Sequence, residues 1–176
     1  MCGTGSLTRS GGPPGRSFVV QRKYEYRRRL PHIQKEGRPI FVTFTTDHRW
    51  QLPGAARDIV VDCCLNGNGS KFDLHAAVVM PDHVHLILTP LRRDDGWTYS
   101  LPEIMHAIKG ASARRINKRL KRRGPVWQEE FFDHVLRSND SLAEKIDYVC
   151  QNPVRAGLTE SVSQYHWLWR GRIPIL

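Results

Sequence analysis

The sequence predicts an α+β fold in which two helices pack on one face of an antiparallel sheet and a further helix follows near the C-terminus. Segments rich in β-branched and aromatic residues alternate with segments of helical period. A short turn, Pro81-Asp82, joins two of the predicted strands as a hairpin. Apolar residues make up 40% and charged residues 25% of the 176, which is typical of one globular domain with its own core.

The predicted elements follow one another closely along the chain. In order, they are a strand over 39–46, a helix over 55–65, a strand over 72–80, a strand from the turn to about 90, a helix from 100 to about 122, a strand over 126–136 and a helix from about 141 to 151. Ser100 and Glu103 form a capping box at the start of the long helix, and Asn152-Pro153 is expected to end the last one. Residues 1–20, rich in Gly, Ser, Pro and Arg, are expected to form a disordered or weakly ordered arm before a single domain over 21–176.

This order, β-α-β-β-α-β and then α, matches the split β-α-β plan of ferredoxin-like and RRM-like domains. Because side chains alternate across a strand, Val84, Leu86 and Leu88 are expected to face the two helices, and His83 and His85 the opposite side. The helix near the C-terminus is the element left to cover that side. On the strand over 72–80, the residues expected to share one face are Phe72, Leu74, Ala76, Val78 and Met80.

The charge of the chain indicates a nucleic-acid partner. Lysine and arginine number 27 against 17 acidic residues, which gives a net charge of +10, and the pI is near 9.9. Clustered basic residues attract phosphate backbones, although a solvated face kept soluble by its charge is the alternative. The residues expected to contact phosphates are Arg27, Arg28, Arg29, Lys109, Arg114, Lys118 and Lys121.

Other features argue against membrane and secreted classes. The sequence has no run of about eighteen apolar residues and no apolar secretory core at its N-terminus. The four cysteines show no Cys-x-x-Cys spacing, which indicates reduced thiols rather than a zinc knuckle. We therefore expect a cytoplasmic protein that is associated with the nucleoid when bound to DNA.

Two sets of residues predict chemistry at the uncovered face of the sheet. His83 and His85 lie two apart on one strand face and form half of a metal site that needs at least one more ligand. On the last helix, Tyr148 and Asn152 share a face one turn apart. A cation held by two imidazoles and an amide oxygen can polarise a phosphate, and a tyrosine hydroxyl can attack it. Taken singly, each has a simpler explanation: a histidine pair on a half-exposed strand, a core tyrosine with a wet hydroxyl, and a helix terminator before proline.

Three stretches together resemble a known family. The stretch over 80–88, MPDHVHLIL, resembles the histidine–hydrophobic–histidine signature of single-tyrosine HUH transposases. The stretches over 127–137 and 148–158, the second of which reads YVCQNPVRAGL, resemble the C-terminal signature of the REP-associated branch. Residues 27–32 and 41–44 also resemble the opening of that branch, so the similarity runs from about residue 24 to 170.

The resemblance implies metal-dependent cleavage and joining of single-stranded DNA at hairpin-forming, REP-like palindromic repeats. By transfer, Tyr148 is the nucleophile that forms a 5′-phosphotyrosine, and His83 and His85 bind Mg²⁺ or Mn²⁺. Asn152 stands where more distant relatives carry a glutamine as third ligand. Two rival hypotheses remain: an RRM-like module that binds structured nucleic acid without chemistry, and a structural protein whose histidines bind zinc. The protein is expected to be a monomer or a homodimer.

Overall fold

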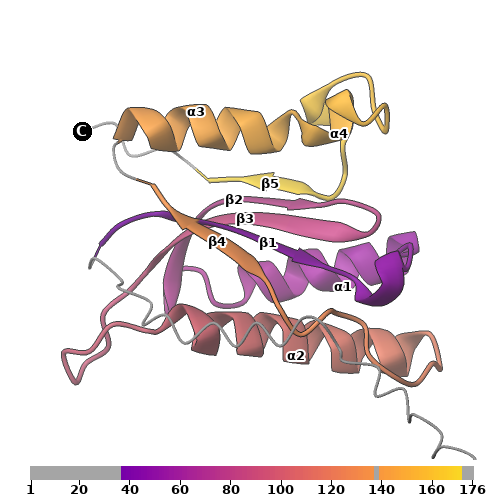
Figure 1. Cartoon of the computed structure of the whole chain (residues 1–176), viewed down its shortest axis with the longest axis horizontal. Coiled ribbons are helices and arrows are strands. Elements are labelled where there is room, and N and C mark those ends of the chain that lie inside the picture. The colour runs from indigo at the N-terminus through magenta and orange to yellow at the C-terminus, as the bar shows by residue number, and fades with distance from the viewer. Residues whose placement is uncertain (1–36, 137–138, 172–176) are drawn as a thin grey trace, which may run out of the picture. The chain divides into compact units, whose positions relative to one another are not determined.

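The computed structural model describes residues 37–136 and 139–171, with the backbone alone for residues 139–141. All of them belong to one compact unit, His32–Leu176. The arm expected over 1–20 and the basic residues Arg27, Arg28 and Arg29 lie outside the described residues. The described strands form one five-stranded sheet in the order β4-β1-β3-β2-β5, in which every pair of neighbours is antiparallel (Figure 1). The predicted α+β class is therefore confirmed.

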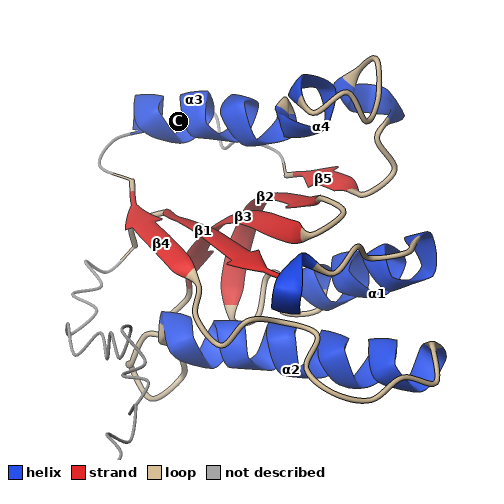
Figure 2. Ribbon diagram, turned by 45° about the vertical axis from the view of Figure 1, so that its right-hand side comes forward, coloured by secondary structure: helices blue, strands red, loops and turns tan. Residues whose placement is uncertain are grey.

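The elements have the following bounds. The strands are β1 (Ile40–Thr45), β2 (Phe72–Val79), β3 (His83–Pro90), β4 (Phe132–Val135) and β5 (Leu168–Arg170). The helices are α1 (Gly54–Leu65), α2 (Leu101–Arg119), α3 (Asn139–Cys150) and α4 (Asn152–Arg155), and short 3-10 turns lie at Asp47–Arg49 and Val162–Gln164. α1 and α2 cover one face of the sheet, and α3 and α4 lie on the other side (Figures 1 and 2).

Each face of the sheet has its own apolar core. On the α1 and α2 side, Val84, Leu86 and Leu88 of β3 are fully buried among residues of both helices. On the α3 side, Ile87 is buried with Ile146 and other residues of α3. The predicted alternation of β3 is therefore confirmed, and it leaves the two histidines on the α3 side of the sheet.

A bulge in β2 changes which side chains share a face. The pairing of β2 with β3 shifts register between Leu74 and Ala76, which makes His75 the extra residue. Phe72 and Leu74 pack in the core under α1 and α2, whereas Ala76 and Val78 pack toward α3. The predicted single apolar face over 72–80 is wrong, because one inserted residue reverses the alternation of every side chain after it.

α2 begins as predicted and ends earlier. The Ser100 hydroxyl accepts from the Glu103 backbone N–H, and the Glu103 carboxylate accepts from the Ser100 N–H, so the capping box is present. The helix ends at Arg119 rather than near residue 122, because Lys121 adopts a left-handed conformation with φ of 51°. The Arg122 N–H then donates to the Asn117 carbonyl, which is the hydrogen bond of a Schellman termination.

The strand expected over 126–136 is limited to Phe132–Val135. Val126 and Trp127 are buried in the core instead, where the Trp127 indole N–H donates to the Ser112 hydroxyl at 3.0 Å. The Lys109 ammonium donates to the carbonyls of Gln128 and Glu129 at 2.7 Å each, so these groups are satisfied outside the sheet. The segment before β4 is therefore held by the buried Trp127 and by Lys109 rather than by strand pairing along its whole length.

The C-terminal part also differs from the expectation. α3 ends at Cys150, but Asn152-Pro153 does not stop helical structure, because Pro153 lies in the first turn of α4, where a missing N–H is tolerated. β5 was not predicted, since three residues carry no clear alternation. β5 pairs with the outer edge of β2, and the Tyr165 hydroxyl beside it donates to the Val79 carbonyl at 2.9 Å.

Candidate active site

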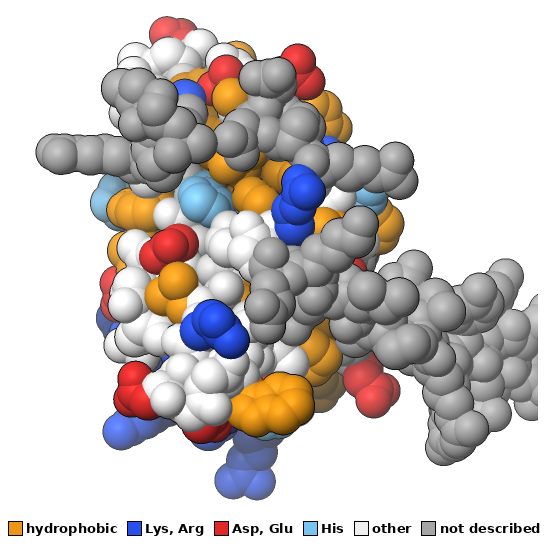
Figure 3. Space-filling model, turned by 90° about the vertical axis from the view of Figure 1, so that its left-hand side faces the viewer, with side chains coloured by type: hydrophobic (Ala, Val, Ile, Leu, Met, Phe, Trp, Pro, Cys, Tyr) orange, Lys and Arg blue, Asp and Glu red, His pale blue; other side chains and the backbone are white. Residues whose placement is uncertain are grey.

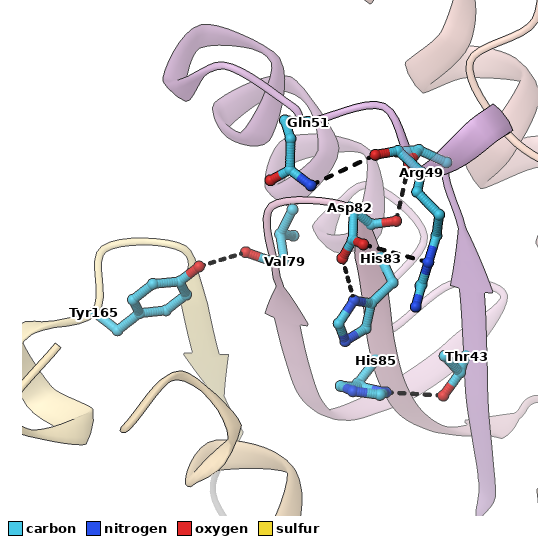
Figure 4. A network of polar contacts seen from close by, with 9 residues as sticks. Thr43, Arg49, Gln51, Val79, Asp82, His83, His85 and Tyr165 are labelled. Carbon is cyan, nitrogen blue, oxygen red and sulfur yellow. Dashed lines mark hydrogen bonds and ion pairs between the residues drawn. The ribbon is translucent and has the colours of Figure 1, made fainter. Parts of the chain in front are cut away.

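The two histidines open β3 directly after the Pro81-Asp82 turn, and each is oriented by a neighbour. His83 Nδ1 lies 2.6 Å from the Asp82 carboxylate, which also pairs with Arg49 at 3.5 Å. His85 Nδ1 lies 2.8 Å from the hydroxyl of Thr43, its partner across the sheet. The two imidazole centroids are 4.7 Å apart (Figure 4). Strand pairing and a turn carboxylate therefore fix both rings.

The surroundings of His85 keep its imidazole neutral. Burial above all, with smaller contributions from the nearby His83, Lys145 and Arg155, lowers the pKa of His85 to about 3. A neutral imidazole offers a nitrogen lone pair to a metal ion, which a protonated one does not. His85 is therefore in the protonation state that a ligand requires across the physiological pH range.

α3 packs over the histidine side of the sheet through one apolar stripe. The stripe consists of Leu142, Ile146 and Val149, each of which is at most 7% exposed. They share a core cluster with Phe41 of β1 and Ile87 of β3. Tyr148 lies on α3 outside this stripe. The side chain of Tyr148 is 51% exposed.

Two cations flank Tyr148. The Lys145 ammonium lies 4.6 Å from the centroid of the Tyr148 ring and 4.1 Å from that of Phe41. The Arg155 guanidinium lies 4.2 Å from the Tyr148 ring centroid and donates to the Tyr148 carbonyl. Because Phe41 also stacks on His85 with centroids 5.6 Å apart, Lys145 and Phe41 connect the tyrosine to the histidine pair. Tyr148, His83 and His85 therefore belong to one region.

Asn152 lies at the start of α4 with its amide held by Arg155. Its Oδ1 accepts from the Arg155 guanidinium at 3.0 Å. Its Nδ2 is buried and has no hydrogen-bond partner among the groups that the structure describes. The amide oxygen has a second lone pair, so a further contact to Oδ1 is chemically available.

The donors in this region fit a divalent cation through the histidine pair. Both Nδ1 atoms are engaged by Asp82 and Thr43, and neither Nε2 hydrogen-bonds to a described residue. This is the arrangement in which an outer-shell partner orients a ligating imidazole. Within residues 37–136 and 139–171, no three His, Cys, Asp or Glu side chains are grouped to hold a metal ion. Among these residues, the third ligand predicted from the sequence is of another type, the Asn152 amide oxygen.

Sequence reasoning assigned no role to Asp82, Thr43, Lys145 or Arg155. Lys145 precedes Tyr148 by three residues and Arg155 follows Asn152 by three, spacings that place each pair on one helix face. Helical spacing was thus a usable signal for Lys145, whereas Arg155 required helical structure to continue past Pro153. Thr43 required the register of β1 with β3, which the sequence does not give.

Among the residues that the structure describes, the basic residues expected to contact phosphates are not gathered at this site. Lys109, Arg114 and Lys118 belong to α2, and Lys121 follows it, on the side of the sheet away from α3. The side chains of Arg114, Lys118 and Lys121 are exposed. The Lys109 ammonium is instead committed to two backbone carbonyls.

Comparison with known proteins identifies the family. The family model described as IS200-like transposase matches residues 55–152, which is more than half of the 176 residues. The chain belongs to the IS200-like transposase family. The matched segment runs from α1 to the first residue of α4, so it contains His83, His85, Tyr148 and Asn152.

Relatives of this IS200-like transposase include REP-associated tyrosine transposases. The protein of that name from Escherichia coli K12 is 31% identical over 94 residues, which cover 53% of this chain and 52% of the relative. A candidate member from Haemophilus influenzae is 28% identical over 99 residues, which cover 53% and 56%. The chain spans about half the length of the curated relatives it matches.

A solved structure shares the fold. The REP-associated tyrosine transposase bound to a REP hairpin gives a TM-score of 0.62 at 22% identity, over 87% of this chain and 94% of that chain. The family resemblance seen in the sequence is confirmed by the family model and the curated relatives. Among the described residues of this transposase, no helix is long and apolar enough to span a membrane.

Proposed function

We propose that this IS200-like transposase cleaves and joins single-stranded DNA at hairpin-forming, REP-like palindromic repeats through a 5′-phosphotyrosine intermediate. Tyr148 is the nucleophile, and His83, His85 and Asn152 are the ligands of Mg²⁺ or Mn²⁺. The observation that carries the proposal is the packing of α3, which brings a half-exposed tyrosine to the same side of the sheet as the neutral, pre-oriented His85. The choice of REP-like hairpins is supported by the relatives, which are REP-associated tyrosine transposases, one of them solved with a bound REP hairpin.

The cleavage step exchanges one phosphodiester bond for another. The Tyr148 oxygen attacks the phosphorus and gives up its proton, the bond to the 3′ oxygen breaks, and that oxygen takes up a proton to leave a free 3′-hydroxyl. The phosphotyrosine keeps the energy of the broken bond, so a second 3′-hydroxyl can displace the tyrosine and restore a DNA strand. When bound, the divalent cation supplies a Lewis acid that polarises a phosphate oxygen.

The residues around Tyr148 prepare the site for a phosphate. Lys145 and Arg155 place positive charge on both helices that border the phenol ring, and a phosphate anion compensates that charge. Asp82 and Thr43 hold the two imidazoles so that their Nε2 atoms remain available. Coordination by the Asn152 oxygen requires that the Arg155 guanidinium share or leave that atom.

We also assign strands β1 to β4 with α1 and α2 to the ferredoxin-like, RRM-like plan. The order β4-β1-β3-β2 with both connecting helices on one face supports this assignment. β5, α3 and α4 are then additions to that plan. We propose that residues 21–176 act as one catalytic domain, as a monomer or a homodimer, and the packing of α3 on its own chain supports a site built within one protomer.

The decisive experiment uses labelled single-stranded hairpin DNA with Mg²⁺ or Mn²⁺ and looks for a covalent protein–DNA adduct. Tyr148→Phe should abolish the adduct and leave hairpin binding largely intact. Tyr165→Phe is the matched control, because it removes a buried phenol hydroxyl that bonds to Val79 and should still form the adduct. An adduct that persists in Tyr148→Phe would refute the proposal.

Replacement of both histidines separates the enzyme from its rivals. In the enzyme, His83→Ala with His85→Ala should remove cleavage while hairpin binding persists. A pure nucleic-acid binder would form no adduct even as the unaltered protein and would lose no function in this variant. A structural zinc protein would contain stoichiometric zinc by elemental analysis and would lose stability in the same variant.

A further inference from the structure

Four aromatic rings form a row across three neighbouring strands on the α3 side of the sheet. His83 and His85 of β3 have centroids 4.7 Å apart, and His85 stacks on Phe41 of β1 at 5.6 Å with an interplanar angle of 27°. Phe41 in turn meets Phe132 of β4 edge-on at 6.3 Å. This ring row therefore leads from the candidate active site to the edge of the sheet.

The outer end of the ring row is exposed. Phe41 is 7% exposed, whereas Phe132 is 52% exposed. Single exposed hydrophobic residues are common and need no explanation. In the part of the chain that the structure describes, however, the exposed large hydrophobic residues are Trp97, Phe132, Tyr148 and Leu158. Phe132 is the outer end of the ring row, and Tyr148 borders the row because it shares the Lys145 ammonium with Phe41.

Two cations lie beside the ring row and Tyr148. Lys145 lies over Phe41, and Arg155 lies over Tyr148. Viewed from the side where β4 ends and α3 begins, the surface exposes histidine and hydrophobic side chains next to one another with a Lys or Arg side chain nearby (Figure 3). Exposed aromatic faces beside cations are the combination that binds single-stranded nucleic acid, because bases stack on the rings and phosphates pair with the cations.

We propose that Phe132 is a stacking platform for one unpaired base of single-stranded DNA, with the Lys145 ammonium on an adjoining phosphate. The platform would hold the strand near the bond to be cleaved, and in this respect the inference rests on the proposed function. Stacking uses the π face that every base has. The platform therefore positions the strand without selecting its sequence.

The test measures DNA binding in the Tyr148→Phe protein, so that neither cleavage nor the identity of the nucleophile affects the result. The probes are a fluorescent oligothymidine of about twelve nucleotides, within the usual site sizes of single-strand binders, and a blunt duplex of the same length. Phe132→Ala should weaken oligothymidine binding by about 5- to 150-fold, the usual range for loss of one stacked base. Duplex binding should change by less than about 5-fold.

Two further variants at Phe132 separate stacking from packing, and a third variant elsewhere is the control. Phe132→Leu keeps an apolar contact with Phe41 but has no π face, so it should bind oligothymidine as weakly as Phe132→Ala, whereas Phe132→Trp should bind as tightly as the parent. Trp97→Ala removes an exposed aromatic ring outside the row and should have no effect. Unchanged affinity in Phe132→Ala, an equal loss for duplex, or an equal loss in Trp97→Ala would overturn the inference.

The two proposals can fail separately. If the stacking inference is wrong, Phe132→Ala with Tyr148 intact still forms the covalent adduct at the parent rate. If the proposed function is wrong, no adduct forms in any variant, while the oligothymidine affinities still report whether a base stacks on Phe132.

Discussion

The contact between α3 and the sheet is tested by Ile146→Ala. Ile146 is 1% exposed and lies at the centre of the stripe formed with Leu142 and Val149. The substitution removes three buried carbon groups, which at about 0.8 kcal/mol each amounts to about 2.4 kcal/mol of lost transfer free energy. A residual cavity adds to this, so the free energy of unfolding should fall by about 3 to 4 kcal/mol, within the range of measured cases.

The loss of packing under α3 should also affect the candidate active site. Ile146 has no chemical role in the proposed mechanism, but it packs the helix that carries Tyr148 on the sheet. Loosened packing should therefore slow adduct formation more than it weakens hairpin binding. Urea unfolding gives the stability, and quenched reactions with labelled hairpin give the rate under conditions where the variant is still folded.

Leu158→Ala is the matched control, because it removes a similar side chain that is 44% exposed. Its stability should change by no more than about 0.5 kcal/mol, as for most surface substitutions. A loss below about 1 kcal/mol in Ile146→Ala, or equal losses of adduct formation and hairpin binding, would show that this stripe does not hold the tyrosine in place.

Three further predictions concern the frame of the domain. Ser112→Ala leaves the buried Trp127 indole N–H without its acceptor and should lower the free energy of unfolding by about 1 to 3 kcal/mol in urea titrations. Lys121→Gly relieves a left-handed backbone and should raise stability by about 1 kcal/mol, with a shallower salt dependence of DNA binding if Lys121 contacts phosphate. Hydrogen bonds from Ser100, then Arg93, lower the pKa of Glu103 to about 2. Stability should therefore be full above the unfolded pKa of about 4.3 and fall as pH drops toward 2, and Glu103→Gln should flatten this profile.

The course of β3 and the faces of α3 were predictable because both depend on regular periods. Alternation alone assigned Val84 and His85 to opposite faces, and helical spacing alone separated Ile146 from Tyr148. Both assignments are confirmed by the two core clusters. The same reasoning was wrong on β2, since the bulge at His75 depends on pairing with β3 and leaves no signature in the sequence of β2 itself.

The role of Arg155 was not predictable for a different reason. Arg155 reaches Tyr148 and Asn152 only because the chain continues into α4 after Pro153, where a helix end was expected. For Lys109, the phosphate contact stays a prediction, and the structure adds that its ammonium donates to two carbonyls of the segment before β4. Charge in a sequence therefore indicates a partner for the whole surface more reliably than a role for one side chain.

The charges around His85 predict that DNA and the divalent cation support each other's binding. After burial and His83, the charges of Lys145 and Arg155 also lower the pKa of His85. Two positive charges near the histidines oppose a metal cation there for the same Coulombic reason. A DNA phosphate beside Tyr148 would compensate these two cations. Mn²⁺ should therefore bind the Tyr148→Phe protein more tightly when hairpin DNA is present, by about 5- to 150-fold, the usual size of such coupling. Paramagnetic resonance titrations of free Mn²⁺ measure this directly. Equal affinities with and without DNA would mean that Lys145 and Arg155 do not bear on the metal site, and that their role is confined to α3 and α4.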